Sequence, residues 1–433
     1  MTNLIVQGGR ALRGAIEPSA NKNAVLPILC GTLLTREPIV LHRVPDITDV
    51  RKILGFFEKL GSSVDMDYDS GTLRIQHGQT LNRDAARLPA GADMRSFLML
   101  VPGLMSLFGE AGLEDDIKGC TLGVREIDPH IEVFERFGVE VSTKGDTITL
   151  AVPKGFQGAQ HWLDYASVTT TENFILCAAT AKGVSRLTNA ASEPHVQEFC
   201  SFLNAMGAKI QGGSSHITVE GVEGLSGCEF TLGDDFHEIA TFLAMGAITG
   251  GEIKVRNGHP EQFPLIDRTF AKFGVEVEHE NGWSKVHANG GLKIRAPFTT
   301  HILQKVEAAP WPYLPVDLLP IFIALGARAE GQMMFWNKVY EGALGWTSEL
   351  AKFGAHTVLC DPHRVITFGG KPLTAAEVES PYIIRVAIAM FMLASSIEGR
   401  STILNADPIR RAHPKFVENL NALGADVEWV PGR

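Results

Sequence analysis

The sequence lacks closely spaced cysteines of the kind that bind zinc or form a disulfide framework. Its six cysteines are scattered with no C-x-x-C pair, whereas both structural zinc sites and disulfide-rich folds depend on short, regular spacings. Cys30 and Cys177 lie in apolar runs and are predicted to be small core residues. The others are Cys120, Cys200, Cys228 and Cys360. The sequence therefore predicts neither a zinc site nor disulfides, and it favours a reducing compartment.

Long apolar runs and an excess of positive charge are also missing. The longest apolar run, residues 382–396, is broken by Arg385 and is too short to span a bilayer. The first ten residues do not have the layout of a signal peptide. A net charge of −10 argues against nucleic acid or an anionic membrane as the main partner. We expect a cytoplasmic protein that holds any anionic ligand with a local cluster of basic residues.

A short motif recurs six times along the chain, which at 433 residues is long enough for two domains. Each copy has a large apolar residue, a glycine, a small residue and then a stretch typical of a strand, as in F-G-V-E-V at 137–141. A glycine in this position is typical of the end of a helix. The six glycines, spaced 67 to 80 residues apart, are Gly61, Gly138, Gly207, Gly274, Gly354 and Gly424.

Two kinds of helix are predicted in each repeat. In most copies a β-rich stretch leads into an amphipathic helix that ends at the glycine. Further upstream lies a far more apolar segment, such as A-V-L-P-I-L-C-G-T-L-L at 24–34 or T-F-L-A-M-G-A-I at 241–248. A helix that is apolar nearly all round belongs in a core. The pattern predicts an α/β fold. Each repeat consists of strand, buried helix, strand, outer helix and strand, and each domain has three repeats.

Polar or charged residues stand at the expected starts of the buried helices. Acidic residues suit a helix N-terminus, because the positive end of the helix dipole stabilises them. Cations there oppose the dipole, unless an anion is bound by the helix end and the side chain together. We therefore predict that these helix starts converge on an anion-binding cleft between the domains. In chain order the residues are Lys22 with Asn23, Arg95, Glu172 with Asn173, Glu238, Asp317 and Arg385.

The stretch K-G-C-T-L-G-V-R-E-I-D-P-H at 118–130 places Cys120 in a glycine-rich loop. A flexible polar loop is a poor place to bury a thiol, and the nearby Arg125 guanidinium would favour the thiolate. From this stretch alone two interpretations stay open. Cys120 is either a bystander in a surface turn or a functional thiol.

Together these motifs resemble those of the enolpyruvyl transferase family over essentially the whole length. The motifs that carry the resemblance are N-K-N-A-V-L-P at 21–27, D-M-R-S at 93–96, G-C-T-L-G-V-R at 119–125 and P-V-D-L at 315–318. The resemblance implies a two-domain inside-out α/β barrel of six β-α-β-α-β-β repeats. The first domain would be 22–234 with the Cys120 lid, and the second 1–21 with 235–433.

The resemblance also implies a reaction. The enolpyruvyl group of phosphoenolpyruvate would be transferred to a hydroxyl of UDP-N-acetylglucosamine with release of phosphate, a step of peptidoglycan synthesis. No metal or organic cofactor is expected, and the choice between monomer and homo-oligomer stays open. Cys120 would protonate C3, Asp317 would act as the base and Lys22 would assist, while lid closure excludes water. The implied substrate-binding residues are Asn23, Arg95, Arg125, Asp128, His130, Ser167, Val168, Asp235, Glu341, Arg385 and Arg411.

The sequence departs from the family pattern mainly on the acceptor side. Tyr165 and Thr169 stand where the family has a cation and a glycine, and Ala343 stands where it has an arginine. Glu126 replaces a usual proline in the lid. Two alternatives follow: the same chemistry on a different nucleotide, sugar or small alcohol, or a non-catalytic ligand-binding paralogue. Retention of both a candidate acid and a candidate base argues against the second.

Overall fold

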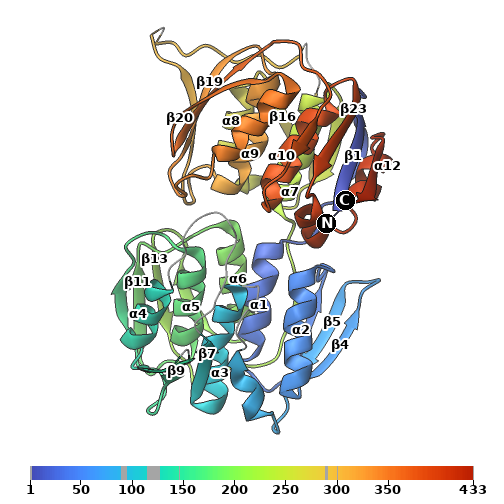
Figure 1. Ribbon diagram of the computed structural model, residues 1–433. Coiled ribbons are helices and arrows are strands. Elements are labelled where there is room, and N and C mark those ends of the chain that lie inside the picture. The colour runs from blue at the N-terminus through green and yellow to red at the C-terminus, as the bar shows by residue number, and fades with distance from the viewer. Residues whose placement is uncertain are drawn as a thin grey trace. The chain divides into compact units, whose positions relative to one another are not determined.

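The computed structural model describes residues 2–88, 95–114, 127–145, 147–287, 291–299 and 301–432. The chain divides into two units, coloured in chain order in Figure 1. The first unit is residues 20–233, and the second combines residues 2–19 with 234–432, each in its described parts. No helix in the described part of the chain has the length and apolar character needed to cross a membrane.

Within its described residues, the first unit contains three four-stranded sheets. In pairing order their strands are β14 (Glu229–Thr231), β3 (Ile39–His42), β5 (Thr72–Gln76) and β4 (Ser63–Asp67); β6 (Arg87–Leu88), β7 (Glu110–Glu114), β9 (Thr147–Ala151) and β8 (Glu140–Lys144); and β10 (Gln160–Trp162), β11 (Val184–Thr188), β13 (His216–Glu220) and β12 (Lys209–Gly212). The helices are α1 (Lys22–Thr32), α2 (Thr48–Leu60), η1 (Arg83–Ala86), η2 (Arg95–Met99), α3 (Leu100–Phe108), α4 (Asp128–Arg136), α5 (Val168–Ala179) and α6 (Pro194–Ala205).

The described residues of the second unit form three more four-stranded sheets. Their strands are β16 (Val277–Glu280), β17 (Trp283–Val286), β15 (Glu252–Arg256) and β2 (Arg13–Ile16); β18 (Gln304–Ala308), β19 (Gly331–Asn337), β21 (Arg364–Gly369) and β20 (His356–Asp361); and β22 (Glu377–Glu379), β23 (Gly399–Leu404), β1 (Thr2–Gly8) and β24 (Val427–Pro431). The helices are α7 (Phe236–Ile248), η3 (Pro260–Gln262), α8 (Pro264–Ala271), η4 (Val316–Leu318), α9 (Leu319–Arg328), η5 (Gly345–Phe353), α10 (Ile384–Ser395), α11 (Asp407–Ala412) and α12 (Phe416–Ala422).

All six sheets share one pairing pattern, with one parallel pair followed by two antiparallel pairs. In the third sheet β10 pairs with β11 in parallel, and β11–β13 and β13–β12 are antiparallel. The chain order there, β10-α5-β11-α6-β12-β13, is the predicted β-α-β-α-β-β repeat. The prediction of six such repeats in an α/β fold is confirmed. The N-terminal strand β1 lies between β23 and β24, so both chain ends meet in one sheet (Figure 1).

The six motif glycines end helices as predicted. All adopt positive φ, the left-handed conformation that glycine enters without the steric cost paid by other residues. Gly61 and Gly354 are themselves the cap residues that follow α2 and η5. Their φ angles are 93° at Gly61, 84° at Gly138, 100° at Gly207, 75° at Gly274, 81° at Gly354 and 93° at Gly424.

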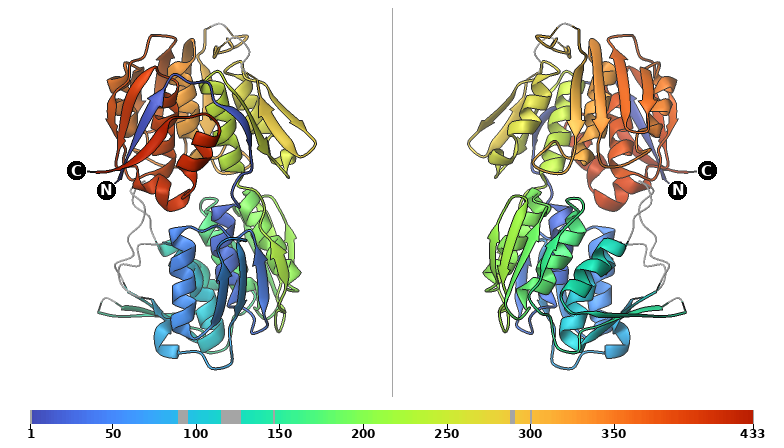
Figure 2. Two further views of the ribbon diagram at one scale, coloured as in Figure 1. Left: turned by 90° about the vertical axis from the view of Figure 1, so that its right-hand side faces the viewer. Right: turned by 90° about the vertical axis from the view of Figure 1, so that its left-hand side faces the viewer.

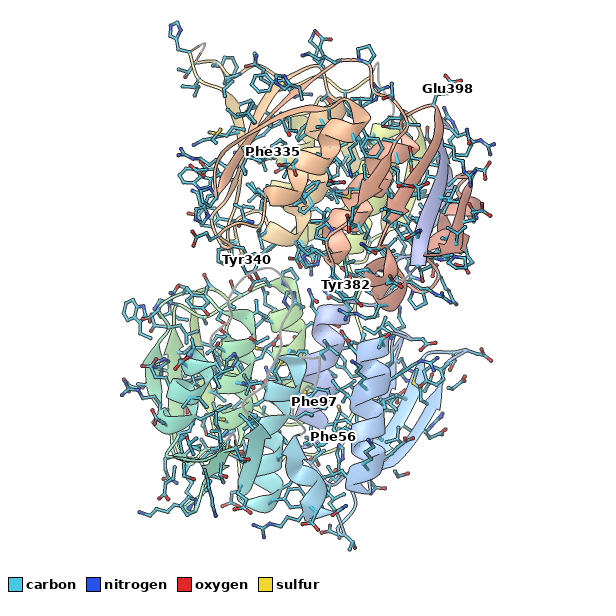
Figure 3. All side chains as sticks on the ribbon, viewed as in Figure 1. Phe56, Phe97, Phe335, Tyr340, Tyr382 and Glu398 are labelled. Carbon is cyan, nitrogen blue, oxygen red and sulfur yellow. The ribbon has the colours of Figure 1, made fainter. Side chains whose placement is uncertain are left out.

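The apolar helices form the centre of each unit, and the sheets lie around them (Figures 1 and 2). All 13 residues of α7 are buried, and α7 packs against α9 and α10. Cys30 in α1 and Cys177 in α5 are fully buried, and burial raises the pKa of both thiols well above the usual value. Their prediction as core residues is confirmed. Aromatic contacts link inner and outer elements, as where Phe56 of α2 meets Phe97 of η2 edge-on at 5.9 Å between ring centroids (Figure 3).

One predicted helix start is wrong. Glu172 and Asn173 do not begin α5 but are its fifth and sixth residues, and both side chains are buried. The helix begins earlier because the Ser167 side chain caps it by accepting the Thr170 N–H. In addition, the outer helix of the fifth repeat is the 3₁₀ helix η5.

Replacing Glu172 by glutamine is expected to stabilise the protein at pH 7. Burial, and then the nearby charge of Glu193, raise the pKa of Glu172 well above its usual value. The folded protein therefore binds a proton that the unfolded chain releases, and this costs stability as pH rises above the unfolded pKa of about 4.3. A neutral amide removes that cost. Urea unfolding at pH 5 and pH 8 would test this, since the gain over wild type must grow with pH. The exposed-site control Glu135→Gln must show no such growth.

His77 is expected to stabilise the first unit at neutral pH, and this contribution is expected to be lost as pH falls. Its ring is buried between Thr32 Oγ1 (2.9 Å from Nε2) and Ser62 Oγ (2.7 Å from Nδ1). Thr32 already donates to Leu29 O, so it accepts from Nε2, and Nδ1 accepts from Ser62. Burial, and then the charge of Arg36, lower the pKa of His77 from 6.5 to about 4.

Because the folded pKa lies below the unfolded one, this contribution to stability is complete above pH 6.5 and is lost as pH falls towards 4. The loss amounts to about 3 kcal/mol. We expect His77→Gln to be less stable than wild type at pH 7, with the difference shrinking towards pH 4 in urea unfolding. A constant difference over this range would show that His77 is not the titrating group. His216→Gln, at an exposed histidine, is the matched control.

Candidate active site

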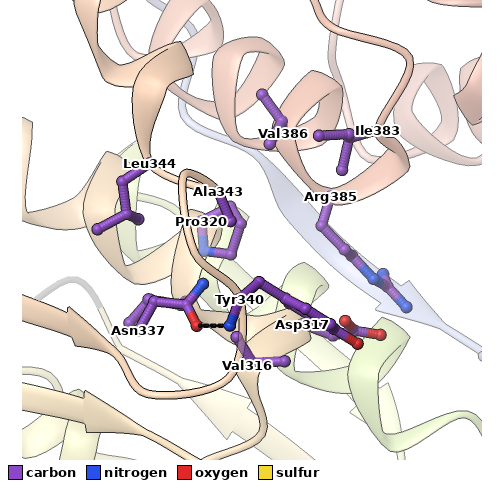
Figure 4. A pocket seen from close by; sticks show the side chains of 11 residues that line it. Val316, Asp317, Pro320, Asn337, Tyr340, Ala343, Leu344, Ile383, Arg385 and Val386 are labelled. Atoms are coloured by element: carbon purple, nitrogen blue, oxygen red, sulfur yellow. Dashed lines mark hydrogen bonds between the residues drawn. The ribbon is translucent and has the colours of Figure 1, made fainter. Parts of the chain in front are cut away.

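A pocket in the second unit brings together two residues predicted from the sequence. It has a volume of about 40 Å³ and is lined by η4, the end of β19 with the turn after it, and the start of α10. Asp317 and Arg385 both line it, as do Asn337 and Tyr340 (Figure 4). The pocket therefore holds a carboxylate and a guanidinium from helix starts that are separate in sequence.

Arg385 is the second residue of α10, and its side chain is nearly buried, at 5% exposure. Among the described residues, neither Nη1 nor Nη2 has a hydrogen-bond partner. A buried cation whose nitrogens make no hydrogen bond is costly, and its place at a helix N-terminus adds to the local positive potential. The arrangement fits an anionic ligand bound by the guanidinium and the helix end together.

Asp235 caps the N-terminus of α7 in its ionised form. Its buried carboxylate caps the helix by accepting the backbone N–H groups of His237 (2.9 Å) and Glu238 (3.2 Å). Burial by itself would raise the pKa of Asp235. The hydrogen bond from His237 and the charges of His237, Arg385 and His413 outweigh burial and lower the pKa overall. Asp235 therefore supplies a fixed negative charge near Arg385.

Glu238 holds the end of the N-terminal segment of the second unit, which closes at Ser19. Its Oε2 accepts the Ser19 N–H at 2.5 Å, and its Oε1 lies 3.5 Å from His413 Nδ1. His237 and His413 are both buried in this group of residues. Glu238 at the start of α7 was predicted from the sequence, but its contact with Ser19 depends on the fold.

Arg411 and Glu341 also belong to the second unit. Arg411 is half-buried in α11, and its guanidinium lies 5.6 Å from the centroid of the Tyr382 ring. Its Nε is buried without a hydrogen-bond partner in the described part of the chain. Glu341 is exposed in the turn after β19. Arg411 thus resembles Arg385 in having a buried guanidinium nitrogen that the described protein groups do not satisfy.

Four predicted residues of the first unit lie at the starts of α1 and α5. Lys22 and Asn23 are the first two residues of α1, and Asn21 caps the helix by accepting the Asn23 N–H at 3.0 Å. Ser167 is the cap of α5, and Val168 is its first residue. The side chains of Lys22, Asn23, Ser167 and Val168 are all half-buried.

His130 lies inside the first unit, three residues into α4. Its ring is fully buried, with Nδ1 2.9 Å from Asn173 Nδ2 and Nε2 3.4 Å from the hydroxyls of Thr169 and Thr170. Asp128, the first residue of α4, is exposed. His130 therefore links α4 to α5, and Thr169, one of the departures from the family pattern, is part of this contact.

Cys120, Arg125 and Glu126 lie outside the described residues, so their assignments stay predictions. Arg95 begins η2, as the sequence predicted for a helix start. Asn337 and Tyr340 were missed, although both line the pocket. Tyr340 stands beside Glu341 in the stretch Y-E-G-A at 340–343, so the sequence held a signal for it. Asn337 gave none.

Residues 6–420 match the family described as EPSP synthase (3-phosphoshikimate 1-carboxyvinyltransferase). The chain belongs to the enolpyruvyl transferase family. The predicted family and enzyme class are confirmed. Among curated relatives, the UDP-N-acetylglucosamine 1-carboxyvinyltransferase of Bradyrhizobium diazoefficiens is 36% identical, covering 99% of this chain and 98% of the relative. The enzyme of that name from Borreliella burgdorferi is 35% identical, covering 99% of both chains.

Solved structures of enolpyruvyl transferases share the fold. The enolpyruvyl transferase NikO from Streptomyces tendae aligns with a TM-score of 0.85 at 22% identity, covering 100% of this chain and 99% of that one. An EPSP synthase from Acinetobacter baumannii aligns with a TM-score of 0.75 at 18% identity, covering 100% of both. The predicted fold class is confirmed by these alignments.

Proposed function

We propose that this transferase moves the enolpyruvyl group of phosphoenolpyruvate to a hydroxyl of UDP-N-acetylglucosamine and releases phosphate. The single observation that carries the proposal is the pocket with Asp317 and Arg385, whose buried Nη1 and Nη2 have no hydrogen-bond partner among the described residues. It offers a cation for an anionic donor and a carboxylate for a hydroxyl proton. We take the two units as the domains of the enzyme and place the reaction in the cytoplasm, in peptidoglycan precursor synthesis.

Each step of the reaction needs a group that the chain supplies. Phosphoenolpyruvate is a small polyanion, and Lys22, Arg385 and Arg411 are proposed to bind it, with Arg95 and Arg125. Asp317 takes the proton of the acceptor hydroxyl as the hydroxyl oxygen bonds to C2 of phosphoenolpyruvate. Cys120 donates a proton to C3, and loss of phosphate together with a C3 proton then restores the double bond as an enolpyruvyl ether.

The names of the relatives support UDP-N-acetylglucosamine as the acceptor, since several at 33–36% identity over 99% of this chain are named for it. The residues that depart from the family pattern lie in two places. Tyr165 is half-exposed and Thr169 contacts His130 in the first unit, whereas Ala343 lines the Arg385 pocket. The acceptor therefore has to be tested separately from the donor.

Phosphate release from phosphoenolpyruvate by the purified protein, with and without UDP-N-acetylglucosamine, tests the proposal. We expect release only when both substrates are present, and saturation by each. Binding of phosphoenolpyruvate without release would reject this acceptor and favour another nucleotide, sugar or alcohol. Absence of phosphoenolpyruvate binding would reject the donor as well, and would favour the non-catalytic alternative.

Cys120→Asp is expected to keep turnover while becoming resistant to the epoxide fosfomycin. A carboxylic acid can still donate a proton, but it lacks the nucleophilic thiolate that opens an epoxide. Residual activity after timed incubation with fosfomycin measures the effect. Wild type and the control Cys360→Ser, at an exposed cysteine of β20, should be inactivated at equal rates. Inactivation of Cys120→Asp at the wild-type rate would remove the thiol from this role.

A further inference from the structure

Ala343 leaves space in the Arg385 pocket at the position where the family pattern has an arginine. It lines the pocket together with Asp317 and Arg385. A volume of about 40 Å³ has room for about three water-sized groups. The substitution therefore removes a cation from the predicted site and leaves a hollow beside the remaining guanidinium.

The turn that carries Ala343 is held by hydrogen bonds to its backbone N–H groups. Asn337 Oδ1 accepts the N–H groups of Val339 (3.0 Å) and Tyr340 (2.9 Å), and the second of these bonds is drawn in Figure 4. Gly342 adopts a φ of 72° and donates its N–H to Pro362 O at 3.2 Å. With these bonds in place, the hollow is a fixed feature of the site that a ligand meets already formed.

Most of the hollow is apolar. Its apolar lining includes Val316, Pro320, Ala343, Leu344, Ile383 and Val386. Among the described residues, the polar side chains that line it are Asp317, Asn337, Tyr340 and Arg385. A fixed apolar pocket with a few polar groups is typical of a site that selects a ligand by shape. The surroundings suit a small hydrocarbon group attached to the anion that Arg385 binds.

We infer that Ala343 makes this pocket a specificity site for enol phosphate donors larger than phosphoenolpyruvate, with one small alkyl substituent. The inference rests on the proposed function, because it takes the donor as the anion held by Arg385. The reaction is otherwise unchanged: the acceptor oxygen bonds to C2, the phosphate ester bond breaks, and the product ether carries the additional alkyl group.

The test compares phosphoenolpyruvate with phosphoenolbutyrate, its homologue with one added methyl group on the double bond, using both geometric isomers. Dissociation constants are measured by titration calorimetry without an acceptor, so that no turnover occurs, and phosphate release in the presence of UDP-N-acetylglucosamine is followed separately. Wild type should bind one isomer of phosphoenolbutyrate at least as tightly as phosphoenolpyruvate, and up to about fourfold more tightly. Ala343→Leu should lower that preference about tenfold or more by filling the hollow.

Two further variants sharpen the comparison. Ala343→Arg should tighten phosphoenolpyruvate binding and weaken binding of the homologue, because it adds a cation and occupies the space. Ala422→Leu, the same substitution at an exposed residue that ends α12, should leave the preference at its wild-type value.

The outcomes separate this inference from the proposed function. If phosphoenolpyruvate is turned over but wild type binds both isomers of the homologue more than tenfold less tightly, the inference is wrong and the function stands. The inference is also wrong if Ala343→Leu weakens both donors by the same factor. If phosphoenolpyruvate binds but no phosphate is released, the proposed acceptor fails, and the ratio of dissociation constants still decides the inference. If phosphoenolpyruvate does not bind, both are rejected.

Discussion

Asp317→Asn is expected to lose turnover by a factor of about 10² to 10⁴, while phosphoenolpyruvate binding changes by only a few fold. The size follows from the usual contribution of a positioned general base. Asparagine is almost the same size as aspartate but cannot accept the hydroxyl proton. Asp317 lines the same pocket as Arg385, so the proposed base lies where the proposed donor anion and acceptor hydroxyl would meet.

The measurement is phosphate release at saturating substrates, together with the dissociation constant of phosphoenolpyruvate for each protein. Asp426→Asn is the control, because it removes an exposed carboxylate of the same unit that pairs with Arg10 at 3.0 Å. Turnover within a few fold of wild type in Asp317→Asn would exclude Asp317 as the base. Loss of both turnover and phosphoenolpyruvate binding would instead indicate a role in binding.

Arg385→Met is expected to weaken phosphoenolpyruvate binding by a factor of roughly 30 to several thousand. Removing one partner of a desolvated charge pair typically costs roughly 2–5 kcal/mol. The stability of the ligand-free protein should change far less than the affinity does. Nη1 and Nη2 have no hydrogen-bond partner among the described residues, so an apolar side chain removes a buried charge without breaking a hydrogen bond of those atoms.

The test of Arg385→Met combines titration calorimetry with thermal unfolding of the ligand-free protein. Affinity should fall while the melting temperature changes little, because removing a buried charge whose Nη atoms lack hydrogen bonds offsets the lost attraction to Asp235. Arg10→Met, which breaks an exposed ion pair, should leave affinity unchanged. A large drop in melting temperature with normal affinity would mean that Arg385 supports the fold and not the ligand.

The repeat architecture was predictable because it depends on local rules. A glycine after each helix marks a left-handed residue, and all six such glycines have positive φ. A segment that is apolar on every side must be buried, and α7 is buried along its whole length. These signals need only neighbouring residues. The interleaving of β1 between β23 and β24 depends on pairing between distant parts of the chain, which the local pattern does not contain.

The site was predictable in part. Helix starts showed where Lys22 and Arg385 would lie, because a cation at a helix N-terminus is unusual enough to stand out. The burial of Glu172 within α5 was not predictable, since its place in the helix depends on the Ser167 cap. The surroundings of His130 were not predictable either, because its partners come from α5, about 40 residues further along the chain.

The positions of the residues that depart from the family pattern indicate which of them should affect ligand choice. Thr169 is part of the contact between α4 and α5 through His130, which gives it a structural role. Ala343 lines the pocket with Asp317 and Arg385, next to the expected chemistry. Of the two, Ala343 is therefore the substitution that we expect to change which ligand is used.

The central claim is the transfer of an enolpyruvyl group to UDP-N-acetylglucosamine, and mass spectrometry of the nucleotide product tests it most directly. After incubation with phosphoenolpyruvate, we predict that UDP-N-acetylglucosamine is converted to its enolpyruvyl ether, with one phosphate released for each ether formed. Recovery of unchanged UDP-N-acetylglucosamine, with the donor intact or hydrolysed to pyruvate, would contradict the account.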